Sequence, residues 1–103
     1  MHITFSPMRH DARLALARKG DALVVNGEVF DFAPLPEGGS LSASAIASPW
    51  FAGPVTRIGG VLHLALILPH GVSAPEATRF PAPLVVRKDG PIALPPRTLG
   101  ETA

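Results

Sequence analysis

Several residue types are missing or scarce in this chain of 103 residues. It contains no cysteine and no tyrosine, and it has a single tryptophan. Without cysteine there are no disulfides, no thiolate chemistry and no zinc sites built on sulfur, which fits a reducing compartment. Charged residues make up 17% of the chain, and its net charge is +1. Nucleic-acid binding normally needs a basic stripe interleaved with aromatic residues, so we do not expect it here.

Long hydrophobic runs are also missing. The longest apolar run, 61–69, is interrupted by His63 and falls well short of the roughly 18 to 20 residues that cross a bilayer. The first residues of the chain lack the basic and apolar regions of a secretory signal. We therefore expect no membrane association and no signal peptide.

Hydrophobic residues are abundant, at 47% of the chain, which is too high a share for a disordered protein. Ten glycines and twelve prolines fall between short apolar runs, and the prolines disfavour long helices. Turn signals spaced by about 8 to 12 residues are typical of all-β domains. We predict one all-β domain over 1–94, followed by a flexible tail at 95–103.

The clearest turn signal is Asn26-Gly27, which joins two β-prone runs at 22–25 and 28–32. Asn-Gly tolerates the positive φ angles of a type I′ turn, so the pattern predicts a hairpin. Side chains alternate between faces along a strand. The two phenylalanines of the second run are therefore expected to face the core together: Phe30 and Phe32.

A second hairpin is predicted around Gly59-Gly60, between the runs 55–58 and 61–68. The face of the second run that includes His63 is expected to be half-buried or to meet a partner. The opposite face consists of leucines alone and is expected to lie in the core (Leu62, Leu64, Leu66 and Leu68).

Shorter strands are predicted at 2–5, 84–87 and 92–94, and a short helix near 41–47. The segment 11–18 is ambiguous, because its composition favours a helix while its alternating leucines favour a strand, which we prefer. Together these segments predict about seven or eight short antiparallel strands in a meandering sheet. That sheet is either closed as a barrel or folded as a sandwich.

Two segments carry the candidate interface or loop residues. Trp50 and Phe51 form the largest apolar pair and are expected to plug the core; an exposed Trp50 would serve as an interface anchor instead. The proline-rich segment 69–83 is predicted to be a long loop, and long loops are often functional. Its candidate residues are two polar side chains and an aromatic ring expected to pin the loop down: His70, Glu76 and Phe80.

Recognisable catalytic and metal-binding motifs are missing. No two histidines have the spacing of a local ligand pair, and no HExxH, GxSxG or GxGxxG occurs. Glu28 and Asp31 fall on opposite faces of one predicted strand, so they do not form a paired-carboxylate site. We expect Asp31 to pair with Arg57 or Arg79 in a structural role. The sequence thus predicts no enzyme activity, no catalytic residue, no cofactor and no metal ion.

Several segments resemble small proteins encoded by tailed bacteriophages and prophages, a group without an established activity. The matching segments are Asn26–Phe32, Pro34–Gly38, Trp50–Val55, Leu68–Gly71 and Ala74–Pro81. The resemblance implies a setting near phage structural genes and no transferable site residue. It implies a location in the cytoplasm of a bacterial host or on a virion.

Two hypotheses of different classes follow. The first is a non-enzymatic phage or prophage structural, assembly or accessory protein that acts through protein–protein contacts, including self-association. The second is a small ligand-binding β-barrel or an enzyme, with a pocket under the loop 69–83 that holds His70 and Glu76.

Overall fold

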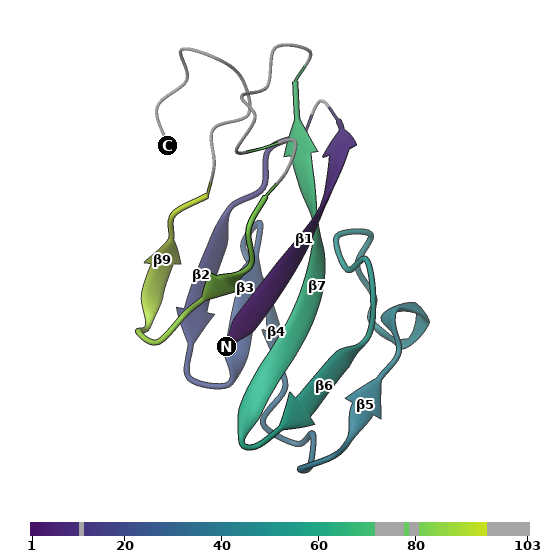
Figure 1. The fold of residues 1–103 in the computed structure, drawn as a ribbon, viewed down its shortest axis with the longest axis vertical. Helices are drawn as coiled ribbons and strands as arrows, with labels where there is room; N and C mark the ends of the chain where they lie inside the picture. Colours follow the sequence, from purple (N-terminus) through teal and green to yellow (C-terminus); the bar gives the residue numbers. More distant parts are fainter. Residues whose placement is uncertain (11, 72–77, 79–80, 95–103) are drawn as a thin grey trace.

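The computed structural model describes residues 1–10, 12–71, 78 and 81–94. Over this part of the chain the fold is all-β, as predicted, and the strands form two separate sheets (Figure 1). The larger sheet has the order β5-β6-β7-β1-β8, and the smaller one has the order β4-β3-β2-β9. The elements are β1 (His2–Arg9), β2 (Leu16–Lys19), β3 (Ala22–Val25), β4 (Glu28–Asp31), β5 (Ser40–Leu41), the 3₁₀ helix η1 (Ala43–Ala45), β6 (Val55–Ile58), β7 (Val61–His70), β8 (Leu84–Val85) and β9 (Gly90–Ile92).

Both predicted hairpins are confirmed. Asn26 and Gly27 have φ angles of 50° and 84° between β3 and β4, as a type I′ turn requires. Gly59 and Gly60 have φ angles of 59° and 77° between β6 and β7. These glycines give the chain left-handed backbone conformations that side chains with a Cβ adopt only with strain.

One hydrophobic core lies between the two sheets. The leucine face of β7 is buried as predicted, and Leu66 has no exposed surface. From the smaller sheet, Leu23 of β3 is also fully buried in this core. Phe32, which directly follows β4, is 4% exposed, whereas Phe30 is only partly buried against the core. Because both sheets contribute to one core without a strand that closes them into a ring, the described architecture is a sandwich.

The prediction that all strands pair antiparallel is wrong at the centre of the larger sheet. There β1 and β7 run parallel over the full length of β1, from His2 opposite His63 to Arg9 opposite His70. The first strand, predicted at 2–5, therefore continues through Ser6 and Pro7 to Arg9. A proline is tolerated because β8 pairs only with His2 and Ile3, so the rest of β1 lies at an edge among the described strands.

The short helix predicted near 41–47 is reduced to the three-residue η1. Leu41 pairs with Val55 in the larger sheet, so the first part of the predicted helix is a strand. Ser42 precedes η1 without a side-chain cap, and its hydroxyl lies 3.2 Å from the hydroxyl of Ser44. Forming the first turn of a helix is unfavourable, and serine has a low preference for helix interiors. Without a side-chain cap, this serine-rich segment therefore does not form a longer helix.

The remaining boundaries also differ from the predictions. The segment 11–18 contains a strand, as we preferred, but the strand is shorter than predicted, since β2 begins only at Leu16. The last two strands, β8 and β9, belong to different sheets, so the chain crosses the open side of the sandwich between them (Figure 1). The predicted tail at 95–103 lies outside the described residues.

Candidate functional site

The larger sheet turns alternate side chains away from the core, and we call these positions the outer face. Ile3 of β1 and Leu64 of β7 are buried in the core. Because side chains alternate between the two faces of a strand, the residues next to them in sequence point away from the core. The outer face consists of His2, Thr4, Ser6 and Met8 of β1, Ser40 of β5, Thr56 and Ile58 of β6, Val61, His63, Ala65, Ile67 and Pro69 of β7, and Val85 of β8. Pro69, at the far end of β7, is fully buried.

The outer face contains no Asp, Glu, Lys or Arg. It carries four of the five large hydrophobic side chains that are exposed in the described part of the chain. Their exposed fractions are 47% for Met8, 61% for Ile58, 41% for Val61 and 57% for Val85. Apolar side chains gathered on one face, in place of scattered single ones, mark interaction surfaces.

His63, a candidate from the sequence, lies near the middle of this face on β7, the central strand of the sheet. Its ring lies beside that of His2, with centroids 5.1 Å apart and planes inclined by 47°. Both imidazoles are half-buried. Sequence reasoning missed the pair because it depends on the parallel register of β1 and β7.

Trp50 lies at the far end of the outer face. The backbone around Trp50 and Phe51 pairs with β7, since the N–H of Ile67 donates to the carbonyl of Trp50 at 2.8 Å. Phe51 points inward, is 6% exposed and contacts Phe30 edge-to-face at 5.2 Å. Trp50 is half-buried and packs against the core cluster, and its ring lies 5.4 Å from that of His10. The expectation that both residues contribute to the core is thus right for Phe51, whereas Trp50 contacts the core with part of its surface exposed.

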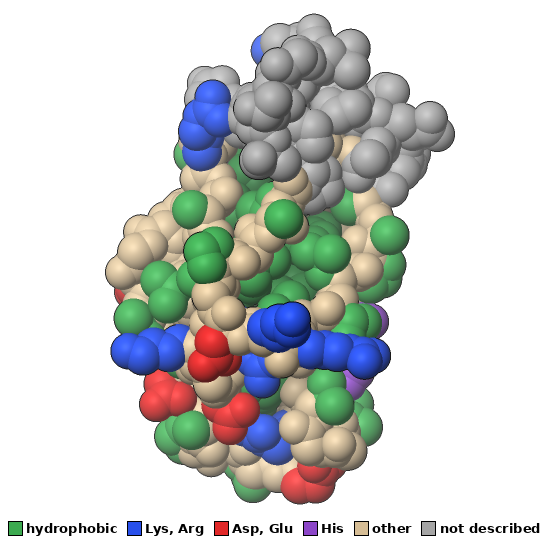
Figure 2. All heavy atoms as spheres, turned by 90° about the vertical axis from the view of Figure 1, so that its left-hand side faces the viewer, with side chains coloured by type: hydrophobic (Ala, Val, Ile, Leu, Met, Phe, Trp, Pro, Cys, Tyr) green, Lys and Arg blue, Asp and Glu red, His purple; other side chains and the backbone are tan. Residues whose placement is uncertain are grey.

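The opposite face of the sandwich differs in charge. On the smaller sheet, the outward positions include Lys19 of β2 and Asp31 of β4. Figure 2 shows charged side chains of both signs gathered on the side of the molecule that carries β9. The uncharged outer face is thus a property of the larger sheet and not of the whole surface.

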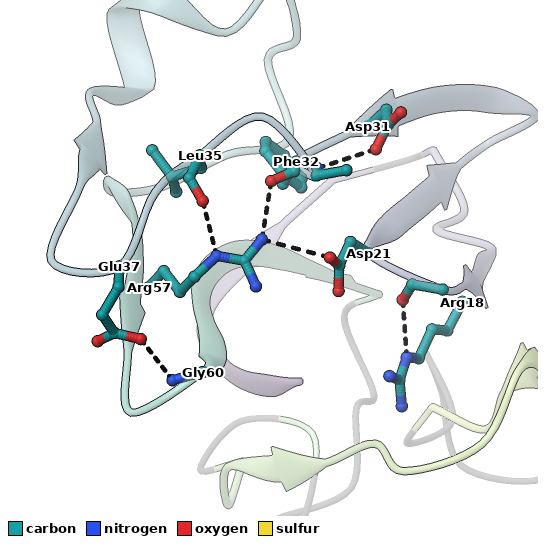
Figure 3. Close-up of polar contacts among 10 residues, drawn as sticks. Arg18, Asp21, Asp31, Phe32, Leu35, Glu37, Arg57 and Gly60 are labelled. Atoms are coloured by element: carbon teal, nitrogen blue, oxygen red, sulfur yellow. Dashed lines mark hydrogen bonds and ion pairs between the residues drawn. The ribbon is translucent and has the colours of Figure 1, made fainter.

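Arg57 ties the two sheets together. It occupies an inward position on β6, and its side chain is only 13% exposed. Its Nε donates to the carbonyl of Leu35 at 2.7 Å, and its Nη2 donates to the carbonyl of Phe32 at 3.0 Å (Figure 3). Nη2 also lies 3.4 Å from the Asp21 carboxylate. All these partners are structural, so Arg57 is a clamp and not a binding residue.

The predicted pairing of Asp31 with Arg57 is wrong, because Asp31 accepts a hydrogen bond from the N–H of Ala33 instead. The alternative partner, Arg79, lies outside the described residues. One sequence signal pointed to the clamp: Arg57 shares the inward parity of Val55. An arginine at such a position must find buried acceptors.

Glu37 holds the Gly59-Gly60 turn. Its carboxylate accepts the N–H of Gly60 at 2.6 Å (Figure 3). It also accepts the N–H of Gly59 at 2.7 Å. These backbone hydrogen bonds, first Gly60 and then Gly59, lower the pKa of the Glu37 carboxyl. The segment between β4 and β5 is thus held by Arg57, through the carbonyl of Leu35, and by Glu37.

Two of the hollows lined by described residues lie near the crossing from β8 to β9. One has a volume of about 270 Å³ and includes Arg18, Arg87 and Met1 in its lining. Burial, and then the charge of Arg18, lower the pKa of the Met1 amine. Arg18 is already engaged there, because it donates to the carbonyls of Gly20 at 3.0 Å and Val86 at 3.1 Å. The other hollow, of about 540 Å³, is a shallow depression over 84–93.

The loop residues predicted from the sequence do not form a site that the structure describes. His70 is the last residue of β7, is half-buried, and has its Nδ1 2.9 Å from the carbonyl of Gly71. Neither hollow includes His70 in its lining. Glu76 and Phe80 lie outside the described residues. Within the described part of the chain, no group of three or more His, Cys, Asp or Glu side chains is placed to hold a metal ion.

Comparisons with models of known families, with curated proteins and with solved structures found no match to this chain. Among the described residues, no helix has the length and hydrophobicity needed to cross a bilayer.

Proposed function

We propose that the chain acts through protein–protein contact made by its outer face, as a phage or prophage structural, assembly or accessory protein. The observation that carries this proposal is the set of exposed hydrophobic side chains on a face without charged residues. The phage setting is supported by the sequence resemblance described above. Interfaces are depleted of charged residues at their centre, which is the composition of this face.

Two further features favour a contact surface. Trp50 is the only tryptophan of the chain and is half-buried, with its backbone paired to that of Ile67 at one end of the outer face. Tryptophan is among the residues most enriched where binding energy concentrates. The clamp at Arg57 and the turn held by Glu37 stiffen the strands behind this face, so little ordering is needed when a partner binds.

Photo-crosslinking in the natural host tests the proposal. A photoreactive residue is placed at Val85, which is 57% exposed on the outer face, or at Val29, which is 60% exposed on the smaller sheet. We expect crosslinked products that contain a second protein chain, either another protein or a copy of this one, from position 85. Position 29 is the matched control and is expected to give none. A lack of products from position 85 would contradict the proposal.

A further inference from the structure

We infer that the two imidazoles of the outer face, His2 of β1 and His63 of β7, bind a zinc ion between them. This inference goes beyond the proposed function and does not depend on it, because a metal site on this face needs no partner protein. The expectation of no metal ion rested on the spacing of histidines along the chain, whereas this pair is formed by the register of two strands.

The spacing of the two rings fits one shared zinc ion. β1 and β7 lie side by side (Figure 1), and their parallel register places His2 directly opposite His63. The ring centroids are 5.1 Å apart. Tetrahedral zinc with Zn–N bonds of about 2.0 Å holds the centroids of two imidazole ligands about 5 Å apart. Two adjacent ligands of square-planar copper(II) bring the centroids closer, to about 4.5 Å, so the spacing favours zinc.

The ring nitrogens of the pair are available to a metal ion. Among the described residues, neither imidazole takes part in a hydrogen bond or an ion pair, and the only contact of each ring is with the other. The histidines outside the pair differ, since Nδ1 of His10 accepts the N–H of Ala12 at 3.0 Å and Nδ1 of His70 lies 2.9 Å from a backbone carbonyl. Half-buried polar nitrogens without a partner lose hydration that a metal bond replaces.

The surroundings of the pair suit a cation with open positions. The pair supplies two of the four ligands that zinc takes, and water supplies the others. Thr56 of β6 lies directly opposite His63, a position from which a hydroxyl can hydrogen-bond to zinc-bound water. Val85 lies opposite His2 on the other side. The outer face has no Lys or Arg to repel the ion.

Calorimetric titration of zinc chloride into the purified chain, prepared without a histidine tag, tests the inference. We expect one zinc ion per chain for the unaltered protein. His2→Gln and His63→Gln each leave a single imidazole, so we expect the dissociation constant to rise by at least about tenfold, because the second ligand is no longer held beside the first. His10→Gln is the matched control. It removes a histidine outside the pair and is expected to leave the affinity unchanged.

Urea unfolding with and without zinc gives a second measurement, which also shows that the variants fold. A ligand that binds only the folded chain raises the unfolding midpoint. We expect zinc to raise the midpoint of the unaltered protein and of His10→Gln, and to leave the midpoints of His2→Gln and His63→Gln unchanged.

Three results would overturn the inference. The first is an unaltered protein that binds no zinc. The second is an affinity that His10→Gln lowers as much as the substitutions in the pair do. The third is binding that His2→Gln abolishes and His63→Gln leaves intact, which would assign the metal to groups beside His2 alone.

Discussion

The imidazoles of His2 and His63 lie side by side on the outer face, with ring centroids 5.1 Å apart, although 60 residues separate them in the chain. The parallel register of β1 and β7 places them directly opposite each other. Their outward neighbours on the flanking strands are Val85 on β8 and Thr56 on β6, and neither is titratable. The pair therefore provides the ionisable side chains at the centre of an otherwise neutral face.

Arg57 is expected to be one of the main determinants of stability. Replacing Arg57 with Met removes the charged donor of two backbone carbonyls, those of Leu35 and Phe32. We expect a loss of about 2 to 4 kcal/mol in the free energy of unfolding, measured with urea. Asp21→Asn is the control: that carboxylate is 46% exposed, so its loss is expected to cost less than about 1 kcal/mol. Equal effects of the two substitutions would show that the ion pair, and not the carbonyl contacts, is what matters.

Glu37 is expected to make part of the stability depend on pH. Its folded-state pKa lies below the ordinary value of 4.5, because the N–H groups of Gly60 and Gly59 bind the charged form. Its contribution is fully present above the pKa of the unfolded chain and is lost as the pH falls through the lower folded-state value. At neutral pH we expect Glu37→Gln to unfold at a lower urea concentration than the unaltered protein. The two midpoints should converge as the pH falls below about 4.5, and a constant difference down to strong acid would contradict this assignment.

Phe51 and Trp50 are expected to differ sharply, although they are adjacent in the sequence. Phe51→Ala removes a ring that is 6% exposed and contacts Phe30 and Phe32, so we expect a cost of about 3 to 5 kcal/mol in unfolding free energy. Trp50→Ala removes a half-buried ring and is expected to cost about 1 to 2 kcal/mol. Equal losses of stability for both variants would place Trp50 in the core after all.

The features that could be predicted from the sequence are the local ones. Asn26-Gly27 and Gly59-Gly60 specify their hairpins because positive φ angles are needed within two residues of each other. The leucines of β7 specify a buried face because the period of a strand is two. Both signals act over a few residues and do not depend on the rest of the fold.

The features that could not be predicted depend on pairing between distant segments. Nothing near His2 indicates that β1 pairs with β7 in parallel, so the His2–His63 pair was missed. The same holds for the Arg57 clamp, whose acceptors are backbone carbonyls more than 20 residues away. The extent to which Phe51 and Trp50 are each buried depends on the pairing of Phe51 with Leu66 of β7, which is distant in the sequence.

The central claim is that the outer face of the larger sheet makes protein–protein contacts. Photo-crosslinking in the host from position 85, with position 29 as the matched control, tests it most directly. We expect products that contain a second protein chain from Val85, which is 57% exposed on the outer face, and none from Val29, which is 60% exposed on the smaller sheet. Products from neither position, or from Val29 alone, would contradict the claim.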